Sequence, residues 1–75
     1  MVRIMSKILV QGTVVKNLPG RQFIVRIDDT GHLAQCHSAG KVHTAHIKIM
    51  EGDRVDVELS EYDLERGRII WRYKQ

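Results

Sequence analysis

Apolar residues recur at every second position in three separate runs of this 75-residue chain. The runs cover residues 22–28, 55–60 and 69–73, and polar or charged residues fill most of the positions between them. Side chains of a β-strand point alternately to its two faces, so this alternation is typical of strands that are buried on one side. The chain is therefore expected to form β-structure with one face packed on a core.

Two further segments are expected to be strands. Residues 7–15 are rich in β-branched side chains, and residues 32–37 follow a short turn at 29–31 that would make them the second half of a hairpin. Gly12 lies in the middle of the first strand, where a glycine marks the bulge or bend that lets a strand curl round a small barrel. Other clusters of turn-forming residues lie at 17–20, 51–53 and 62–67.

The segment from Ser38 to Met50 breaks the alternation, and its apolar residues fit neither a strand nor a helix consistently. We expect one short helix there, followed by an extended approach to the next strand. Five strands with a helix between the third and the fourth predict an all-β, five-stranded Greek-key barrel rather than a βαβ sheet. Residues 1–75 are expected to form a single domain, with residues 1–6 as a flexible N-terminus.

The net charge favours an anionic partner. Twelve Lys and Arg stand against nine Asp and Glu, which gives a formal charge of +3, a balance that suits nucleic acid but also serves solubility alone. No apolar run approaches the length that spans a bilayer, and the N-terminus lacks the features of a signal peptide. We therefore expect a cytoplasmic protein without membrane contact, and the single cysteine fits a reducing compartment.

The last strand carries most of the functional signal. Alternation predicts that Arg68, Arg72 and Lys74 project together from one face, where a row of cations can follow a phosphate backbone. The alternative is an ordinary solvated face. Trp71 falls on the opposite side and is assigned to the core with Phe23, while Tyr62 and Tyr73 stay possible contacts near strand ends.

Four histidines and Cys36 lie between positions 32 and 46, which raises the question of a metal site or a nucleophile. The paired short spacing of structural zinc sites is missing, and Cys36 and His37 are strand neighbours that point to opposite faces. His43 and His46 are one helical turn apart, which surface polar residues explain equally well. No phosphate-binding loop is present either, so we expect no metal, no cofactor and no catalytic residue.

A set of short segments in a fixed order along the chain carries a more specific signal. They include Gln11-Gly12-Thr13-Val14, Leu18-Pro19, Gly31-His32, Gly40-Lys41, Gly52-Asp53, Tyr62-Asp63-Leu64 and Gly67-Arg68-Ile69. Taken together, from about residue 8 to residue 73, they resemble the bacterial translation initiation factor one family. No single piece is specific, and the closing segment is the most telling part of the ordered set.

The resemblance implies an OB-fold that binds the aminoacyl site of the small ribosomal subunit through ribosomal RNA. There it would occlude elongator tRNA and assist initiation factors two and three, as a monomer that acts by occupancy rather than by chemistry. In that family, basic residues of the loop after the third strand and arginines of the last strand face the RNA. The matching positions here are Gly40, Lys41, Lys48, Arg68 and Arg72.

The loop after the third strand departs from the family pattern. Where the family has several basic residues after its Gly-Lys pair, this chain has Val42, His43, Thr44, Ala45 and His46. Histidine is largely neutral at pH 7, so the loop is less charged and the chain is expected to be a divergent member. The full set of expected RNA contacts is Gly40, Lys41, His43, Lys48, Arg66, Arg68, Arg72 and Lys74.

Two other functions remain open from the sequence. The first is a general single-stranded RNA-binding protein or RNA chaperone, although the aromatic run that such barrels carry on their second and third strands is missing. The second is a protein-interaction module whose positive charge serves solubility.

Overall fold

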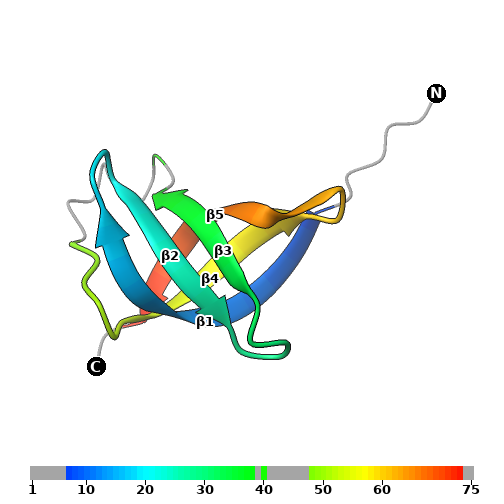
Figure 1. The fold of residues 1–75 in the computed structure, drawn as a ribbon, viewed down its shortest axis with the longest axis horizontal. Helices are drawn as coiled ribbons and strands as arrows, with labels where there is room; N and C mark the ends of the chain where they lie inside the picture. Colours follow the sequence, from blue (N-terminus) through cyan, green and yellow to red (C-terminus); the bar gives the residue numbers. More distant parts are fainter. Residues whose placement is uncertain (1–6, 39, 41–47, 74–75) are drawn as a thin grey trace.

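A computed structural model of the chain describes residues 7–38, 40 and 48–73 and shows a closed barrel of five strands (Figure 1). The strands are β1 (Lys7–Leu18), β2 (Gln22–Ile27), β3 (Leu33–Ser38), β4 (Arg54–Ser60) and β5 (Asp63–Tyr73). Their order round the barrel is β1-β2-β3-β5-β4, and β4 pairs back onto β1. The expected all-β, five-stranded Greek-key barrel is confirmed.

Two expectations fall largely outside the described residues. The sequence predicts a short helix between Ser38 and Met50, and most of that segment is not described. The N-terminal residues 1–6 also lie outside the described part. Within the described ranges, no helix is long and apolar enough to cross a membrane.

β1 pairs with two neighbouring strands, β4 and β2. Residues 7–13 pair with β4 and residues 12–18 pair with β2, so Gly12 lies opposite residues of both strands. A Cβ atom at Gly12 would lie 2.6 Å from the carbonyl oxygen of Arg26 and 2.6 Å from Cγ1 of Val25. Gly12 is therefore a point of close approach to β2, and the register shift of β1 lies not at the expected Gly12 but between Val14 and Lys16.

β5 closes the barrel. Its residues 66–69 pair with β3 in parallel, and the strand also pairs with β4 in antiparallel orientation as far as Tyr73. The expected connection at 62–67 is wrong for residues 63–67, which belong to the strand. Gly67 is a packing position rather than a turn, because a Cβ atom there would lie 2.5 Å from Cδ2 of Leu59.

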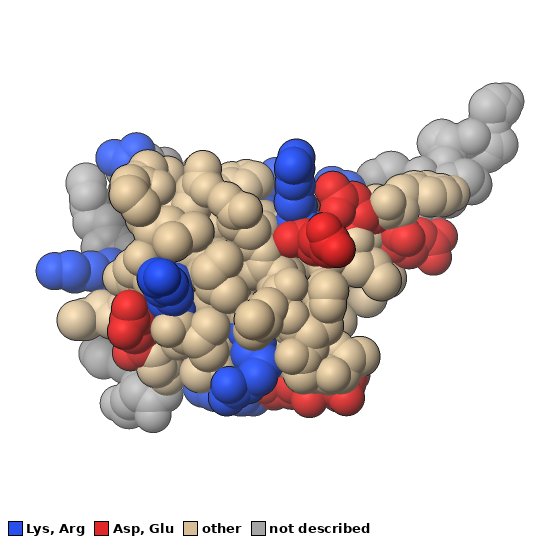
Figure 2. All heavy atoms as spheres, in the orientation of Figure 1, with Lys and Arg blue, Asp and Glu red and all other residues tan. Residues whose placement is uncertain are grey.

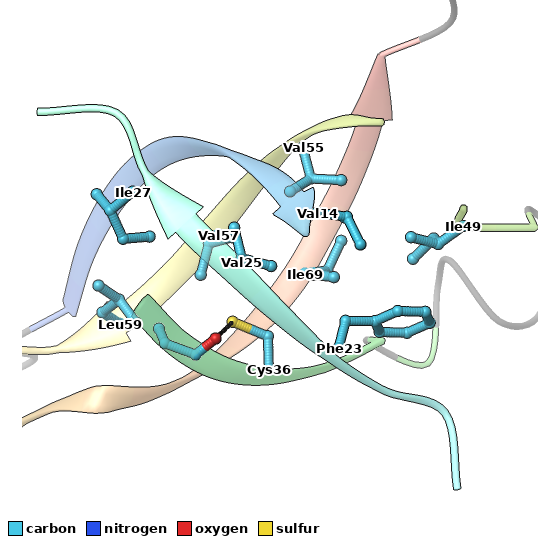
Figure 3. Packing of buried hydrophobic residues seen from close by; sticks show 11 residues of the cluster. Val14, Phe23, Val25, Ile27, Cys36, Ile49, Val55, Val57, Leu59 and Ile69 are labelled. Carbon is cyan, nitrogen blue, oxygen red and sulfur yellow. Dashed lines mark hydrogen bonds between the residues drawn. The ribbon is translucent and has the colours of Figure 1, made fainter. Parts of the chain in front are cut away.

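The core is built from the inward positions of all five strands and from Ile49 in the segment before β4 (Figure 3). Its members are apolar throughout, and among the described residues no polar or charged side chain is buried. They are Val14, Phe23, Val25, Ile27, Ala34, Cys36, Ile49, Val55, Val57, Leu59 and Ile69. The alternation in β2 and β4 therefore predicted their inward faces correctly.

The pairing of β5 with β4 is interrupted at two places, and the second of them, near the C-terminal end of β5, is a single extra residue. Val57 pairs with Ile69 and Asp56 pairs with Trp71, so Ile70 has no opposite number on β4. An extra residue of this kind is a β-bulge, which shifts the alternation of the residues that follow it. The inward and outward positions of β5 are therefore exchanged after residue 70.

Two expectations fail because of this bulge. Strict alternation assigns Trp71 to the core, but Trp71 is 49% exposed, and Tyr73 beside it on the same outer face is 39% exposed. Alternation also places Arg68 and Arg72 on one face, but Arg72 lies opposite the fully buried Val55 and so turns toward the barrel interior. A strict period of two cannot show where an extra residue enters a strand.

Gly12→Ala is expected to lower the free energy of unfolding by about 1–3 kcal/mol, because its methyl group would overlap the β2 backbone. Gly40→Ala is the matched control, since a Cβ atom at Gly40 meets nothing within 4 Å. Urea unfolding measures both variants. Equal stability of the two variants would contradict the close approach of β1 and β2.

Candidate nucleic-acid interface

A groove of about 600 Å³ lies on the outer surface of the barrel. Its lining comes from all five strands, and β3, β4 and β5 contribute three residues each. The lining residues are Lys7, Gln22, Gln35, Cys36, His37, Glu58, Leu59, Ser60, Arg66, Gly67 and Arg68. Most are the outward neighbours of core residues, because the alternation that buries one face of each strand presents the other to solvent.

Strand pairing places four of these side chains in one row across the sheet. His37 of β3 lies between Gln22 of β2 and Arg68 of β5, and Arg68 in turn lies opposite Glu58 of β4. A second row joins Gln35 to Arg66. The residues of the groove are far apart in sequence and are brought together by backbone pairing alone.

The groove is cationic, with three basic side chains against one carboxylate. Glu58 lies between two of them, 2.5 Å from Nη2 of Arg68 and 3.5 Å from Nζ of Lys7. The hydrogen bond from Arg68, helped by the charge of Lys7, lowers the pKa of the Glu58 carboxyl. Arg66 forms no ion pair within the described ranges, so its guanidinium is available to an anion.

The groove suits the phosphates and polar edges of nucleic acid. Arginine presents a planar fork of donors that can hold phosphate oxygens in pairs. The amides of Gln22 and Gln35 hydrogen-bond to each other and offer further donors and acceptors beside the arginines. The described lining has no Phe, Tyr or Trp, so recognition here would rest mainly on charge and hydrogen bonds, with the His37 ring as the one side chain of the described lining that could stack on a base.

The structure brings together two of the eight residues expected to contact RNA. Arg66 and Arg68 share the groove, whereas Gly40, Lys48 and Arg72 do not line it. Gly40 and Lys48 are exposed on either side of the segment between β3 and β4. Lys41, His43 and Lys74 lie outside the described residues.

Arg72 holds the segment before β4 against the end of the barrel. Its Nη1 donates a hydrogen bond to the carbonyl oxygen of Lys48 at 2.8 Å and lies 3.8 Å from the carboxylate of Asp53. The N–H of Gly52 also donates to the carbonyl oxygen of Val14 at 2.7 Å. Arg72 therefore fixes the position from which Lys48 projects, and its own side chain is only 26% exposed.

Sequence reasoning missed six polar groove residues, namely Lys7, Gln22, Gln35, His37, Glu58 and Ser60. Each is a polar residue on the solvent side of a strand, and such residues look alike in a sequence. The signal that singles them out is the cross-strand register, which places them beside Arg66 and Arg68.

Cys36 belongs to the strand that borders the groove, but its side chain lies in the core and is no nucleophile in this state. The residue is 1% exposed, and burial raises the pKa of its thiol to about 12, against a smaller opposing effect of a backbone hydrogen bond from Gly67. His37 points outward, as the alternation predicted. Across the described ranges, no three His, Cys, Asp or Glu side chains gather as metal ligands.

Charged side chains form separate groups on the face of the molecule shown in Figure 2. Lys and Arg are interspersed with Asp and Glu, and uncharged surface lies between the groups. Positive charge is therefore local, which makes the groove more informative than the net charge of the chain.

Comparisons with known proteins point to one family. A family model described as "Translation initiation factor 1A / IF-1" matches residues 5–75. The solution structure of translation initiation factor one from the Wolbachia endosymbiont strain TRS of Brugia malayi is 44% identical, with a TM-score of 0.73. That match covers 92% of this chain and 80% of the other.

Two larger proteins contain a similar barrel. YjeQ from Thermotoga maritima is 26% identical with a TM-score of 0.75, and the match covers 91% of this chain but 23% of that chain. YloQ, described as a circularly permuted GTPase, is 17% identical with a TM-score of 0.73 over 89% of this chain and 23% of that chain. The likeness to YloQ is one of fold alone.

The Cys36 thiol is expected to resist alkylation by iodoacetamide at about pH 8, because only the thiolate reacts and burial disfavours it. Because folding raises this pKa, the contribution of the Cys36 thiol to the free energy of unfolding is fully present below pH 9.0 and is lost as the pH rises toward about 12. Mass spectrometry compares the extent of Cys36 alkylation in the folded protein with that in guanidinium chloride. Equal reaction in both states would contradict the burial of Cys36.

Proposed function

The chain belongs to the translation initiation factor 1A / IF-1 family, and from this membership we propose that it binds the aminoacyl site of the small ribosomal subunit through ribosomal RNA. The family consists of non-enzymatic, RNA-binding factors of protein biosynthesis, and membership implies binding to the small subunit. Under the proposal the chain occludes elongator tRNA and assists initiation factors two and three. It acts as a monomer, in the cytoplasm, by occupying a site.

The cationic groove is the observation that carries this proposal. Arg66 and Arg68 project from one rigid strand at alternate positions, next to hydrogen-bonding side chains of β2 and β3. Cations borne by a paired strand can neutralise neighbouring phosphates without the entropic cost of ordering their backbone. An occupancy factor needs such a preformed surface, because it contributes no chemical step.

Glu58 sets the affinity of the groove. Its carboxylate occupies Arg68 and Lys7 in the free protein, so a phosphate that approaches Arg68 meets a negative charge already bound there. The phosphate and the Glu58 carboxylate repel each other, and salt screens this repulsion. Arg66 therefore attracts a phosphate, whereas Glu58 repels one that approaches Arg68. This favours anions that several side chains of the groove contact at once.

The loop between β3 and β4 supplies a second group of proposed contacts. Lys48 and Gly40 flank it, and we add Lys41 on the resemblance to the family, His43 from its place in the same loop and Lys74 as a further cation after the last strand. Arg72 supports this group indirectly, because its bond to the carbonyl oxygen of Lys48 positions the segment. Substitution of Arg72 would mix a change of binding with a change of structure, so a binding experiment should leave it intact.

Arg66→Gln with Arg68→Gln is expected to weaken binding to purified bacterial small subunits by about tenfold or more, and to lower the salt dependence by about one phosphate per cation. Glu58→Gln is expected to act in the opposite direction, since it removes the negative charge from the groove. Co-sedimentation with labelled protein at two salt concentrations measures the affinities. A general single-stranded RNA serves as competitor.

Lys16→Gln with Arg26→Gln is the matched control, because it removes the same charge from exposed positions that do not line the groove. Its affinity should stay within about twofold of the unaltered protein, apart from the general effect of net charge. If the control weakens binding as much as the groove variant, the groove is not the contact surface. Binding that any RNA displaces would contradict a specific ribosomal site.

A further inference from the structure

A second outer surface has a different chemistry. Leu9 of β1 and, across β4 from it, Trp71 and Tyr73 of β5 are exposed on one outer sheet surface, which we call the aromatic face; these side chains are 66%, 49% and 39% exposed. Strand pairing aligns Gln11, Asp56 and Trp71 in one row across β1, β4 and β5. The three apolar side chains therefore project from one continuous sheet rather than from mobile loops.

A hollow of about 360 Å³ adjoins the aromatic face. Its lining holds three carboxylates and no Lys or Arg, although the chain as a whole is positively charged. The lining residues are Leu9, Val10, Gln11, Asp28, Asp29, Asp56 and Tyr73. This charge is the reverse of that in the groove, and it repels a phosphate backbone.

The carboxylates are held in place by their neighbours. The Tyr73 hydroxyl donates to Asp56 at 2.8 Å, and Arg54 donates two bonds to Asp28, at 3.0 and 2.7 Å. Arg54 thus offsets the charge of Asp28, whereas Asp29 and Asp56 form no ion pair within the described ranges. Two negative charges remain in the hollow, beside the rings of Tyr73 and Trp71.

We propose that the aromatic face and its hollow dock an extended protein segment that carries arginine or lysine. Charge complementarity selects this occupant, because a cationic side chain can lie in the hollow between Asp29 and Asp56 while its stem covers Leu9. The neighbouring rings add a cation–π attraction, which is strongest for tryptophan. A protein partner is favoured over RNA, because the carboxylates beside the rings of Trp71 and Tyr73 would repel an RNA backbone that approached those rings.

The lining of the hollow shares no residue with the lining of the groove, but the two are neighbours on the outer surface, since Leu9 lies opposite Glu58 across the β1–β4 pair. An occupant of the hollow therefore lies beside the groove and does not use Arg66 or Arg68. This inference goes beyond the proposed function and does not depend on it, because peptide docking can be tested without ribosomes.

Trp71 is the single tryptophan of the chain, so its fluorescence reports directly on the aromatic face. The probe is a short peptide of alternating glycine and arginine, compared with the same peptide in which citrulline replaces arginine. The arginine peptide is expected to change the Trp71 emission saturably and to bind about tenfold more tightly than the citrulline peptide. Asp29→Asn with Asp56→Asn should weaken its binding about fivefold, while the amide oxygen introduced by the second substitution still accepts the bond from Tyr73.

Glu61→Gln with Glu65→Gln is the matched control, because it removes the same charge from exposed acids at the β4–β5 hairpin. Peptide affinity close to that of the unaltered protein supports the hollow as the site. Should the first pair of substitutions unfold the barrel, Asp29→Asn alone tests the same charge from an exposed turn. An unchanged Trp71 emission, an equal loss in the control, or tighter binding of a single-stranded oligoribonucleotide at Trp71 would each overturn the proposal.

Discussion

Closure of the barrel by β5 determines what every outer surface of this protein presents. The strand pairs with β3 in parallel over residues 66–69 and with β4 in antiparallel orientation as far as Tyr73. One extra residue, Ile70, interrupts the pairing with β4 between Ile69 and Trp71, and a bulge of this kind bends a strand and increases its twist. Because the bulge exchanges the inward and outward positions that follow it, Arg68 faces the groove, whereas Arg72 faces the barrel end and Trp71 faces solvent.

Arg68, Arg72 and Trp71 are close together in β5, but their different orientations give them three different roles. Arg68 joins Arg66 in a cationic groove that suits ribosomal RNA, whereas Arg72 supports the segment that carries Lys48. Trp71 lies on the aromatic face, next to a hollow lined by carboxylates. A strand with strict alternation would place both arginines on one surface and the tryptophan in the core, and the aromatic face would not exist.

The sequence predicted the barrel well and its surfaces less well, for a physical reason. Alternation identified the buried faces of β2 and β4, because burial on one side of a strand leaves a local trace in a sequence. The bulge at Ile70 leaves no such trace, since it depends on pairing with residues far away in the chain. The groove was found only in part for the same reason: Arg66 and Arg68 lie on the last strand that the sequence singled out, whereas Gln22 and Glu58 join them only through cross-strand register.

The most direct test of this arrangement is acrylamide quenching of the Trp71 fluorescence in the free, folded protein. Trp71 is the only tryptophan, and its exposed position after the bulge predicts a red-shifted emission and quenching close to that of N-acetyltryptophanamide. Core tryptophans emit at shorter wavelength and are protected from quenchers. A blue-shifted, protected Trp71 would show that β5 alternates without a bulge, and the division of its residues between RNA groove, barrel end and aromatic face would be wrong.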